Sequence, residues 1–243
     1  TGYFGFQRQD NAEPTIQGEI EQALDKISGR AVGIVGAGRT DAGVHATGQI
    51  IAFDLDWRHG SNKLRDALNA NLPESIAVRA VDETRNDFHP RYDARSRTYV
   101  YRLYVAESRD PLRRRYTWHL GSAALDDESM QVAASALVGE HDFSTFGTPP
   151  QGDNPVRVVF DAQWDVGEEH CFAITANAFL YRMVRRIVGM LAQVGLGRMT
   201  PSAFHDILTA CDSSLVTVVA PPQGLTLVNV NYEDTPSPAG GTL

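Results

Sequence analysis

The sequence predicts an α+β protein in which strands and helices alternate with short connections. Apolar residues at the spacing of a helical face mark four segments, at 15–27, 61–70, 128–138 and 179–194. Apolar runs typical of strands lie at 31–35, 49–55, 76–81, 98–105, 156–166, 171–176 and 225–232. Because the two kinds of element alternate along both halves of the chain, we expect two sheets, or one continuous sheet with helices on one face.

Start and stop signals support the first three helices. Pro14 and Thr15 precede the first helix, and Gly29 follows it. Pro73 follows the second helix, since proline cannot continue a helix. The third lies between Asp126, a favourable capping residue, and Gly139. Each of these helices is therefore predicted from its ends as well as from its apolar face.

The fourth helix, at 179–194, has a cationic side. At about 100° per residue, Arg182, Arg185 and Arg186 fall opposite the apolar residues. A solvated polar face is the ordinary explanation, but no acidic residue stands four positions from any of the three, so docking of an anion is the alternative. The apolar side consists of Leu180, Met183, Val184, Ile187, Val188, Leu191 and Val194.

Charge is unevenly distributed along a chain whose net charge is −8. Residues 85–115 contain nine arginines and four acidic residues, a net charge of +5, which leaves −13 for the rest. Arginine supplies 20 of the 22 basic residues, and its planar guanidinium suits bidentate contact with phosphate. The clustered arginines favour a nucleic-acid partner, although any one of them could be an ordinary surface residue.

The same region offers a place to divide the chain. Residues 110–115 are a charged run that we interpret as a linker, which predicts an N-terminal half at 1–109 and a C-terminal half at 110–233. Residues 234–243 are rich in Pro, Gly and Ser, and we expect them to form a loose tail.

Other sequence features exclude several classes of protein. No apolar segment approaches the ~20 residues of a membrane-spanning helix, so we expect a cytoplasmic protein with no membrane partner. Cys171 and Cys211 have no metal-ligand partner nearby in the sequence, and we expect free, buried thiols. The seven histidines include no pair at i, i+4, so the sequence predicts no metal site.

The most informative stretch is the glycine-rich loop at 36–48. Four glycines make it pliable, and Arg39, Asp41 and His45 are its ionisable side chains. Asp41 stands where a dinucleotide-binding loop requires its third glycine, which excludes that class of site. A phosphate-binding loop fits the spacing, but no helical pattern follows it. Spacing alone leaves two interpretations open, a carboxylate nucleophile at Asp41 or an Asx turn that Asp41 itself caps.

The loop residues from Gly38 to Ala46 resemble the signature of the tRNA pseudouridine synthase A family. Further matches to this family follow in its order along nearly the whole chain. They are Phe4 with Gln7 and Gln9, Asn69-x-Asn71-Leu72-Pro73, Phe88-His89-x-Arg91, Arg97-x-Tyr99-x-Tyr101, Gly139-x-His141-Asp142-Phe143, Ala176-Asn177-Ala178-Phe179-Leu180, Met183-Val184-Arg185-x-Ile187-Val188-Gly189 and Ala220-Pro221-x-x-Gly224-Leu225.

The resemblance implies a fold and an activity. The fold would be two ferredoxin-like (RNA-recognition-motif-like) halves with a merged, mainly antiparallel sheet, helices on one face and the active cleft between the halves. The activity would be isomerisation of uridine to pseudouridine in the anticodon stem-loop of tRNA, by a homodimer that needs no cofactor. Family members usually carry one more strand before the position of Thr1, so we expect this sequence to be clipped or incompletely ordered at its N-terminus.

The resemblance also implies roles for individual residues. Asp41 would be the nucleophile, Arg185 the cation that holds it ionised, and Tyr99 the ring that stacks on the flipped base. Tyr101 shares a side of its strand with Tyr99, and we expect it to pack in the core. A non-catalytic RNA-binding module of the same fold is the alternative, and it would not need Asp41 and Arg185 together. The residues expected to bind substrate are Arg39, Thr40, His45, Arg91, Arg97, Arg182 and Arg186.

Overall fold

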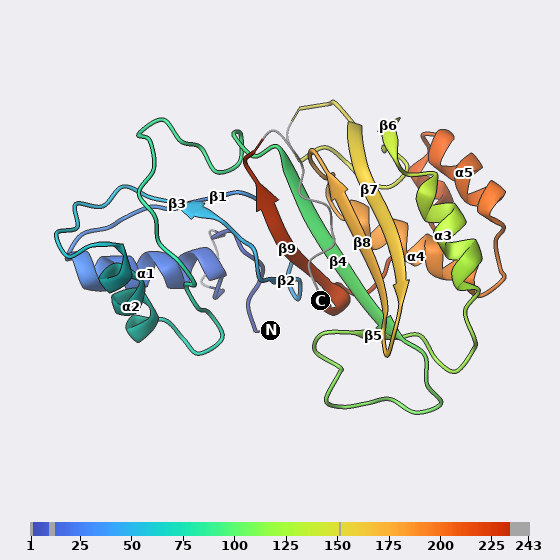
Figure 1. Cartoon of the computed structure of the whole chain (residues 1–243), viewed down its shortest axis with the longest axis horizontal. Helices are drawn as coiled ribbons and strands as arrows, with labels where there is room; N and C mark the ends of the chain where they lie inside the picture. Colours follow the sequence, from blue (N-terminus) through green and yellow to red (C-terminus); the bar gives the residue numbers. More distant parts are fainter. Residues whose placement is uncertain (1, 10–12, 151, 234–243) are drawn as a thin grey trace. The chain divides into compact units, whose positions relative to one another are not determined.

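The computed structural model describes residues 2–9, 13–150 and 152–233 (Figure 1). The chain forms two compact units, the first made of Thr1–Gly43 and Gln49–Ala94 and the second of Val44–Gly48 and Arg95–Leu243. Five α-helices and nine strands in the described residues confirm the predicted α+β class. None of these helices combines the length and the apolar character that crossing a membrane requires. The predicted tail at 234–243 lies outside the described residues.

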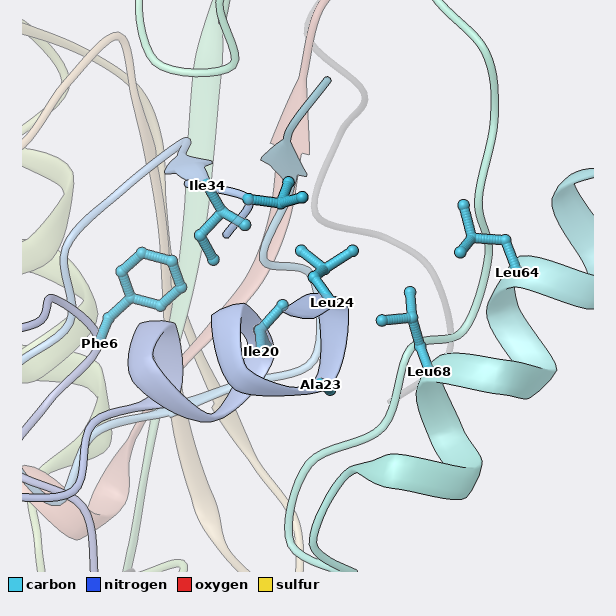
Figure 2. Packing of buried hydrophobic residues seen from close by; sticks show 8 residues of the cluster. Phe6, Ile20, Ala23, Leu24, Ile34, Leu64 and Leu68 are labelled. Carbon is cyan, nitrogen blue, oxygen red and sulfur yellow. The ribbon is translucent and has the colours of Figure 1, made fainter. Parts of the chain in front are cut away.

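The first unit packs two helices on a short antiparallel ribbon. The helices are α1 (Ile16–Ser28) and α2 (Ser61–Asn71), and the ribbon pairs β1 (Val35–Gly36) with β3 (Ile51–Ala52). Figure 2 shows how Phe6, Ile34 and side chains of both helices meet in one apolar cluster. The cluster consists of Phe6, Ile20, Ala23, Leu24, Val32, Ile34, Leu64 and Leu68.

Local signals set the ends of α1 as the sequence predicted. The Thr15 hydroxyl accepts a hydrogen bond from the Gly18 N–H, which satisfies one of the free donors at the start of the helix. Gly29 ends the helix with φ of 71°, a left-handed conformation in which glycine avoids the strain of a side chain. The second predicted helix is also confirmed, as α2.

The strands of the first unit are shorter than predicted, and the prediction of a strand at 76–81 is wrong. Residues 76–81 have no regular structure, although Ile76 and Val78 still pack against the apolar cluster. The side-chain amide of Asn69 donates to the Val78 carbonyl at 2.8 Å, and its oxygen accepts from the Val78 N–H at 2.7 Å. A side chain therefore satisfies the backbone groups that a neighbouring strand would otherwise have paired.

The second unit is built on a seven-stranded, mostly antiparallel sheet. Its order is β2 (His45–Ala46), β9 (Leu225–Asn231), β4 (Ser96–Tyr104), β8 (His170–Ala176), β7 (Val156–Val166) and β6 (Gly139–Asp142), and β5 (Trp118–His119) also pairs with β4. The β2–β9 and β4–β5 pairs are parallel. The four long predicted strands are confirmed as β4, β7, β8 and β9, whereas the three short strands were not predicted.

Three helices accompany this sheet: α3 (Asp127–Ser135), α4 (Met183–Gly195) and α5 (Pro201–Thr209). In Figure 1, α3 lies beside β7, with α4 and α5 in contact with it. The predicted cap is confirmed, because the Asp126 carboxylate accepts from the Ser129 N–H at 3.0 Å and stabilises the start of α3. Helix α5 was not predicted, although Thr200 caps it and Pro201 is its first residue.

Helix α4 begins four residues later than predicted. Arg182 has φ of 60°, so it lies outside the helix as a left-handed residue before Met183. The predicted apolar side is buried, as expected, but Gly189, Met190 and Ala192 are buried too. Helix α4 is therefore buried on more sides than the spacing of its apolar residues predicted.

The charged run at 110–115 lies inside the second unit, because the strands before and after it, β4 and β5, pair with each other. The chain passes from one unit to the other after Gly43, after Gly48 and after Ala94. Separate functional halves at 1–109 and 110–233 stay a prediction.

The two cysteines are free, as predicted, but neither is fully buried. Cys171 is half-buried in β8, and burial raises the pKa of its thiol. Cys211 is exposed, so the expectation of a buried thiol is wrong there. It follows α5 at a surface position with φ of 53°.

Candidate active site

The loop that carries Asp41 is fixed through its backbone within the first unit. Phe6 donates its N–H to the Thr40 carbonyl at 3.0 Å, directly before Asp41. The side-chain amide of Gln49 donates to the Gly38 carbonyl at 2.8 Å. Asp41 itself is half-buried. The peptide groups around Asp41 are therefore held from two directions, which suits a side chain that must be presented in one orientation.

No helix begins in this loop. Ala42 and Gly43 form a turn, in which Gly43 has φ of 81°, and the chain then enters β2. A phosphate-binding loop requires a helix N-terminus directly after its glycines, because the free N–H groups there bind the phosphate. The expectation that no helix follows these glycines is therefore confirmed.

Strand β2 holds the end of the same loop on the sheet of the second unit. His45 pairs with Thr226 of β9, and the N–H groups of Thr47 and Gly48 both point to the Leu227 carbonyl. A Cβ on Gly48 would stand 2.1 Å from the Val228 carbonyl oxygen, so only glycine fits at this position. The predicted loop thus contains a short strand, β2, that was not predicted.

His45 makes two contacts within the second unit. Its Nε2 lies 2.7 Å from the Arg115 carbonyl oxygen, and its ring centroid lies 5.0 Å from that of Tyr116. Burial lowers the pKa of the imidazole, and the hydrogen bond to Arg115 partly opposes this effect. His45 therefore joins β2 to the end of the arginine-rich segment.

The two tyrosines of β4 have different surroundings. Tyr101 is fully buried and donates its hydroxyl to the Pro221 carbonyl at 2.8 Å, which confirms that it packs in the core. Burial also raises the pKa of Tyr101, so it stays protonated. Tyr99 meets the ring of Phe179 edge to face, with centroids 5.0 Å apart. The pairing of β4 with β9 shifts register between Thr98 and Tyr99, so Tyr99 stands at an irregularity of the sheet.

Arg185 is tied to the segment that precedes β9. Its Nε donates to the Ala220 carbonyl at 2.8 Å, and the Ala220 N–H donates to the Arg185 carbonyl at 2.9 Å. A Cβ on Gly189 would lie 2.2 Å from the Val218 carbonyl oxygen, so this segment packs directly on α4. The arginine side of α4 is therefore partly covered by protein and is not a solvated face.

The arginines that were predicted to bind substrate differ in exposure. Arg97 is buried and donates to the Asn177 carbonyl at 2.8 Å, and Arg91 is half-buried, with its guanidinium carbon 5.9 Å from the Tyr92 ring centroid. Arg186 is half-buried, and its Nε has no hydrogen-bond partner among the residues that the structure describes. Arg182 is exposed and stacks on Tyr181 at 4.9 Å. Arg39 is exposed beside Asp41 in the sequence, and Thr40 is half-buried.

Several arginines of the segment 85–115 are neutralised by nearby acids. Arg113 lies 3.3 Å from Asp110, 3.5 Å from Glu168 and 3.8 Å from Glu169, and its guanidinium also stacks on Tyr104. Arg85 pairs with Asp87 and Asp93, and Arg102 lies 3.9 Å from Glu169. Asp87, Asp93 and Asp110 are already counted in the +5 of this segment, but Glu168 and Glu169 lie outside it, so the +5 overstates the positive charge that the segment offers to a ligand. Arg114 and Arg115 are exposed.

The structure brings some predicted site residues together and divides others between the two units. The first unit contains Arg39, Thr40, Asp41 and Arg91. The second unit contains the other six, which are His45, Arg97, Tyr99, Arg182, Arg185 and Arg186. Sequence reasoning missed Gln49, Phe179 and Ala220, whose contacts hold Gly38, Tyr99 and Arg185. Phe179 and Ala220 stood within the matching motifs, so their presence there was the available signal. The described residues contain no group of three or more His, Cys, Asp or Glu side chains that could hold a metal ion.

Comparison with known proteins shows similarity over almost the full length. A profile of the tRNA pseudouridine synthase family matches residues 1–93 and 133–233. The chain is 42% identical over 234 residues to tRNA pseudouridine synthase A of Brevibacillus brevis, which covers 96% of this chain and 95% of that protein. It is 42% identical over 235 residues to the same enzyme of Thermosipho melanesiensis, with the same coverage. For a Shewanella relative the identity is 38% over 241 residues, covering 96% of this chain and 90% of that protein.

Proposed function

This chain belongs to the tRNA pseudouridine synthase A family, and from that premise we propose how its residues isomerise uridine to pseudouridine in tRNA. The match to the family over 96% of the chain is the observation that carries the activity. The enzyme is an isomerase that acts on tRNA. We assign its target uridines to the anticodon stem-loop, its working form to a homodimer and its location to the cytoplasm.

The reaction moves the uracil base from one bond to another. The bond between N1 and the ribose C1′ breaks, the base turns, and C5 bonds to C1′. C5 loses a proton and N1 gains one, so the composition of the nucleotide is unchanged. No electron or group leaves the substrate, and the proposed mechanism uses no cofactor.

Asp41 is the nucleophile in this proposal. Its carboxylate bonds to C1′ or to C6 of the base, and this bond breaks when the new carbon–carbon bond forms. The support is the fixed loop backbone around Asp41, held by Phe6 and Gln49. Such anchoring keeps a carboxylate in an attacking geometry with little loss of entropy at the moment of reaction.

Arg185 and Tyr99 complete the proposed set of catalytic residues. A guanidinium beside Asp41 favours the ionised carboxylate, and Arg185 is itself oriented by its hydrogen bond to Ala220. Tyr99 offers its ring to the extruded uracil and assists removal of the C5 proton. Arg39 enters the space that the base leaves, because it is exposed two residues before Asp41. In this proposal the active cleft lies between two ferredoxin-like halves.

The remaining residues bind RNA in this proposal. Guanidinium groups match the geometry of phosphate. Four arginines therefore contact phosphate groups of the RNA or orient neighbouring residues that contact them: Arg91, Arg97, Arg182 and Arg186. Thr40 and His45 contribute to substrate binding from the segment that carries Asp41. Their combined contacts offset the cost of extruding a base, which is a few kcal/mol.

Replacement of Asp41 by asparagine tests this function. Asp41→Asn keeps the size of the side chain but removes the nucleophile, so we expect near-normal tRNA affinity and no pseudouridine. Asp54→Asn is the matched control, because Asp54 is an exposed carboxylate of the same unit. The measurements are tRNA binding and chemical mapping of pseudouridine in the bound tRNA. Activity retained by Asp41→Asn would contradict the nucleophile role, and wild-type protein that binds tRNA without forming pseudouridine would favour the non-catalytic RNA-binding module.

A further inference from the structure

The hydrogen bond between His45 and Arg115 joins two segments that are distant in sequence. His45 lies on β2, four residues after Asp41, and Arg115 ends the arginine-rich segment 85–115. A carbonyl oxygen can only accept a hydrogen bond, so the Nε2 of His45 must carry the hydrogen at 2.7 Å from the Arg115 oxygen. The imidazole also packs on Tyr116, which fixes the plane of the ring.

We define residues 113–117 as the arginine turn. At its start, the Arg113 carbonyl accepts from the Tyr116 N–H at 3.0 Å and from the Thr117 N–H at 3.1 Å. The Arg113 side chain is held by Asp110, Glu169 and the Tyr104 ring. At its middle residue, His45 holds the Arg115 carbonyl. The turn is therefore held at Arg113 and at Arg115, and the side chains of Arg114 and Arg115 are exposed.

We propose that His45 is a positioning residue for RNA binding, which holds the arginine turn on β2 so that Arg114 and Arg115 reach phosphate groups of the bound tRNA. This inference rests on the proposed function, because it takes the ligand to be RNA. The single Nε2 hydrogen is already bonded to Arg115, so it does not also donate to a phosphate. His45 thus acts on RNA through the turn.

The burial of His45 supports this role. Burial lowers the pKa of the imidazole, so the ring stays neutral near pH 7. A neutral ring with the hydrogen on Nε2 is the form that donates to a carbonyl without burying a charge. Within the second unit, the segment 85–115 has two other exposed arginines, Arg95 and Arg109. Both lie outside the arginine turn.

Three substitutions of His45 separate its hydrogen bond from its packing. His45→Gln can place an amide N–H near the position of Nε2, His45→Phe keeps a ring beside Tyr116, and His45→Asn is too short to reach the Arg115 oxygen. The measurement is tRNA affinity across a series of salt concentrations, together with the single-turnover rate at saturating enzyme. His205→Phe is the matched control, because His205 is exposed on α5.

We expect His45→Phe and His45→Asn to lower the slope of log affinity against log salt by up to about two, since each lost phosphate contact removes roughly 0.7 to 0.9. His45→Gln should restore the slope, and the control should leave it unchanged. In a variant that also carries Arg114→Gln and Arg115→Gln, His45→Phe should change the slope no further, because the contacts it supports are already gone.

Two results would overturn the proposal. One is a wild-type slope in His45→Phe or His45→Asn, and the other is a reduced single-turnover rate with unchanged affinity. Should His45→Phe not fold, His45→Asn and His45→Gln still give the comparison. Failure of the proposed function would look different: wild-type protein would form no pseudouridine, while the dependence of the salt slope on His45 could still be measured.

Discussion

The side-chain amide of Gln49 donates a hydrogen bond to the carbonyl oxygen of Gly38 over 2.8 Å. This bond connects the residue that follows the glycine-rich loop to the residue three positions before Asp41. The Gln49 Oε1 is buried and has no hydrogen-bond partner among the residues that the structure describes. A buried acceptor without a partner costs free energy. The hydrogen bond that Gln49 donates to Gly38 offsets this cost, which is why we infer that Gln49 is oriented by that bond.

Gln49→Glu and Gln49→Met should therefore slow catalysis. Glutamate places a second acceptor against the Gly38 oxygen, and methionine keeps the length but removes the donor. We expect a loss of roughly 10- to 100-fold in kcat with tRNA affinity nearly unchanged, because a small displacement of Asp41 spoils its attack. Single-turnover kinetics and tRNA binding provide the check. Wild-type kcat in both variants would show that Gln49 does not position the loop.

The tyrosines of β4 should separate stability from activity. Tyr101→Phe leaves the Pro221 carbonyl without its partner, so we expect the free energy of unfolding to fall by about 1–3 kcal/mol while kcat persists. Tyr99→Phe should instead lower kcat, since Tyr99 is proposed to assist proton removal. Urea denaturation and single-turnover rates on both variants test this contrast. A loss of kcat in Tyr101→Phe alone would reverse the assignment.

Gly48→Ala should destabilise the second unit. The new Cβ would stand 2.1 Å from the Val228 carbonyl oxygen, so β2 and β9 must move apart. Overpacking of this kind costs about 1–3 kcal/mol. Gly33→Ala is the matched control, because a Cβ there meets nothing within 4 Å. Urea denaturation should show no loss for the control, and equal stability of both variants would contradict the close approach.

Neutralising the exposed arginines should weaken the salt dependence of tRNA binding. Arg114→Gln with Arg115→Gln should lower the slope of log affinity against log salt by up to about two, with little change in the turnover of bound substrate. The control pair is Arg8→Gln with Arg65→Gln, because both arginines already pair with acids in the first unit. An unchanged slope in the test pair would assign the phosphate contacts to other arginines.

The lowered pKa of His45 gives the stability a pH dependence. Because the folded pKa lies below its ordinary value of 6.5, the unfolded chain binds more protons in the interval between the two values. Stability should therefore fall as the pH drops from above 6.5 toward the folded pKa. His45→Gln has no such group, so acidification over this interval should destabilise the wild type more than the variant. Thermal unfolding at several pH values measures the difference, and parallel curves would contradict it.

The sequence by itself determined the features whose causes lie within a few residues. Thr15 and Asp126 cap their helices through donors three residues away, and the long strands follow runs of apolar residues. Resemblance to a family over nearly the whole chain also indicated the loop of Asp41 and the two residues proposed to act with it, Tyr99 and Arg185. Their joint arrangement with Asp41 stays a prediction.

Only the tertiary structure decided which distant groups satisfy one another. Helical spacing placed Arg182 on α4, but the chain adopts a left-handed conformation there before the helix starts. Composition counted Arg113 as a free positive charge, whereas Glu168 and Glu169 neutralise it from more than fifty residues away. The His45 bond to Arg115 spans 70 positions. Local patterns record the preferences of neighbouring residues, while these contacts depend on backbone groups and charges that only folding brings within a few ångströms.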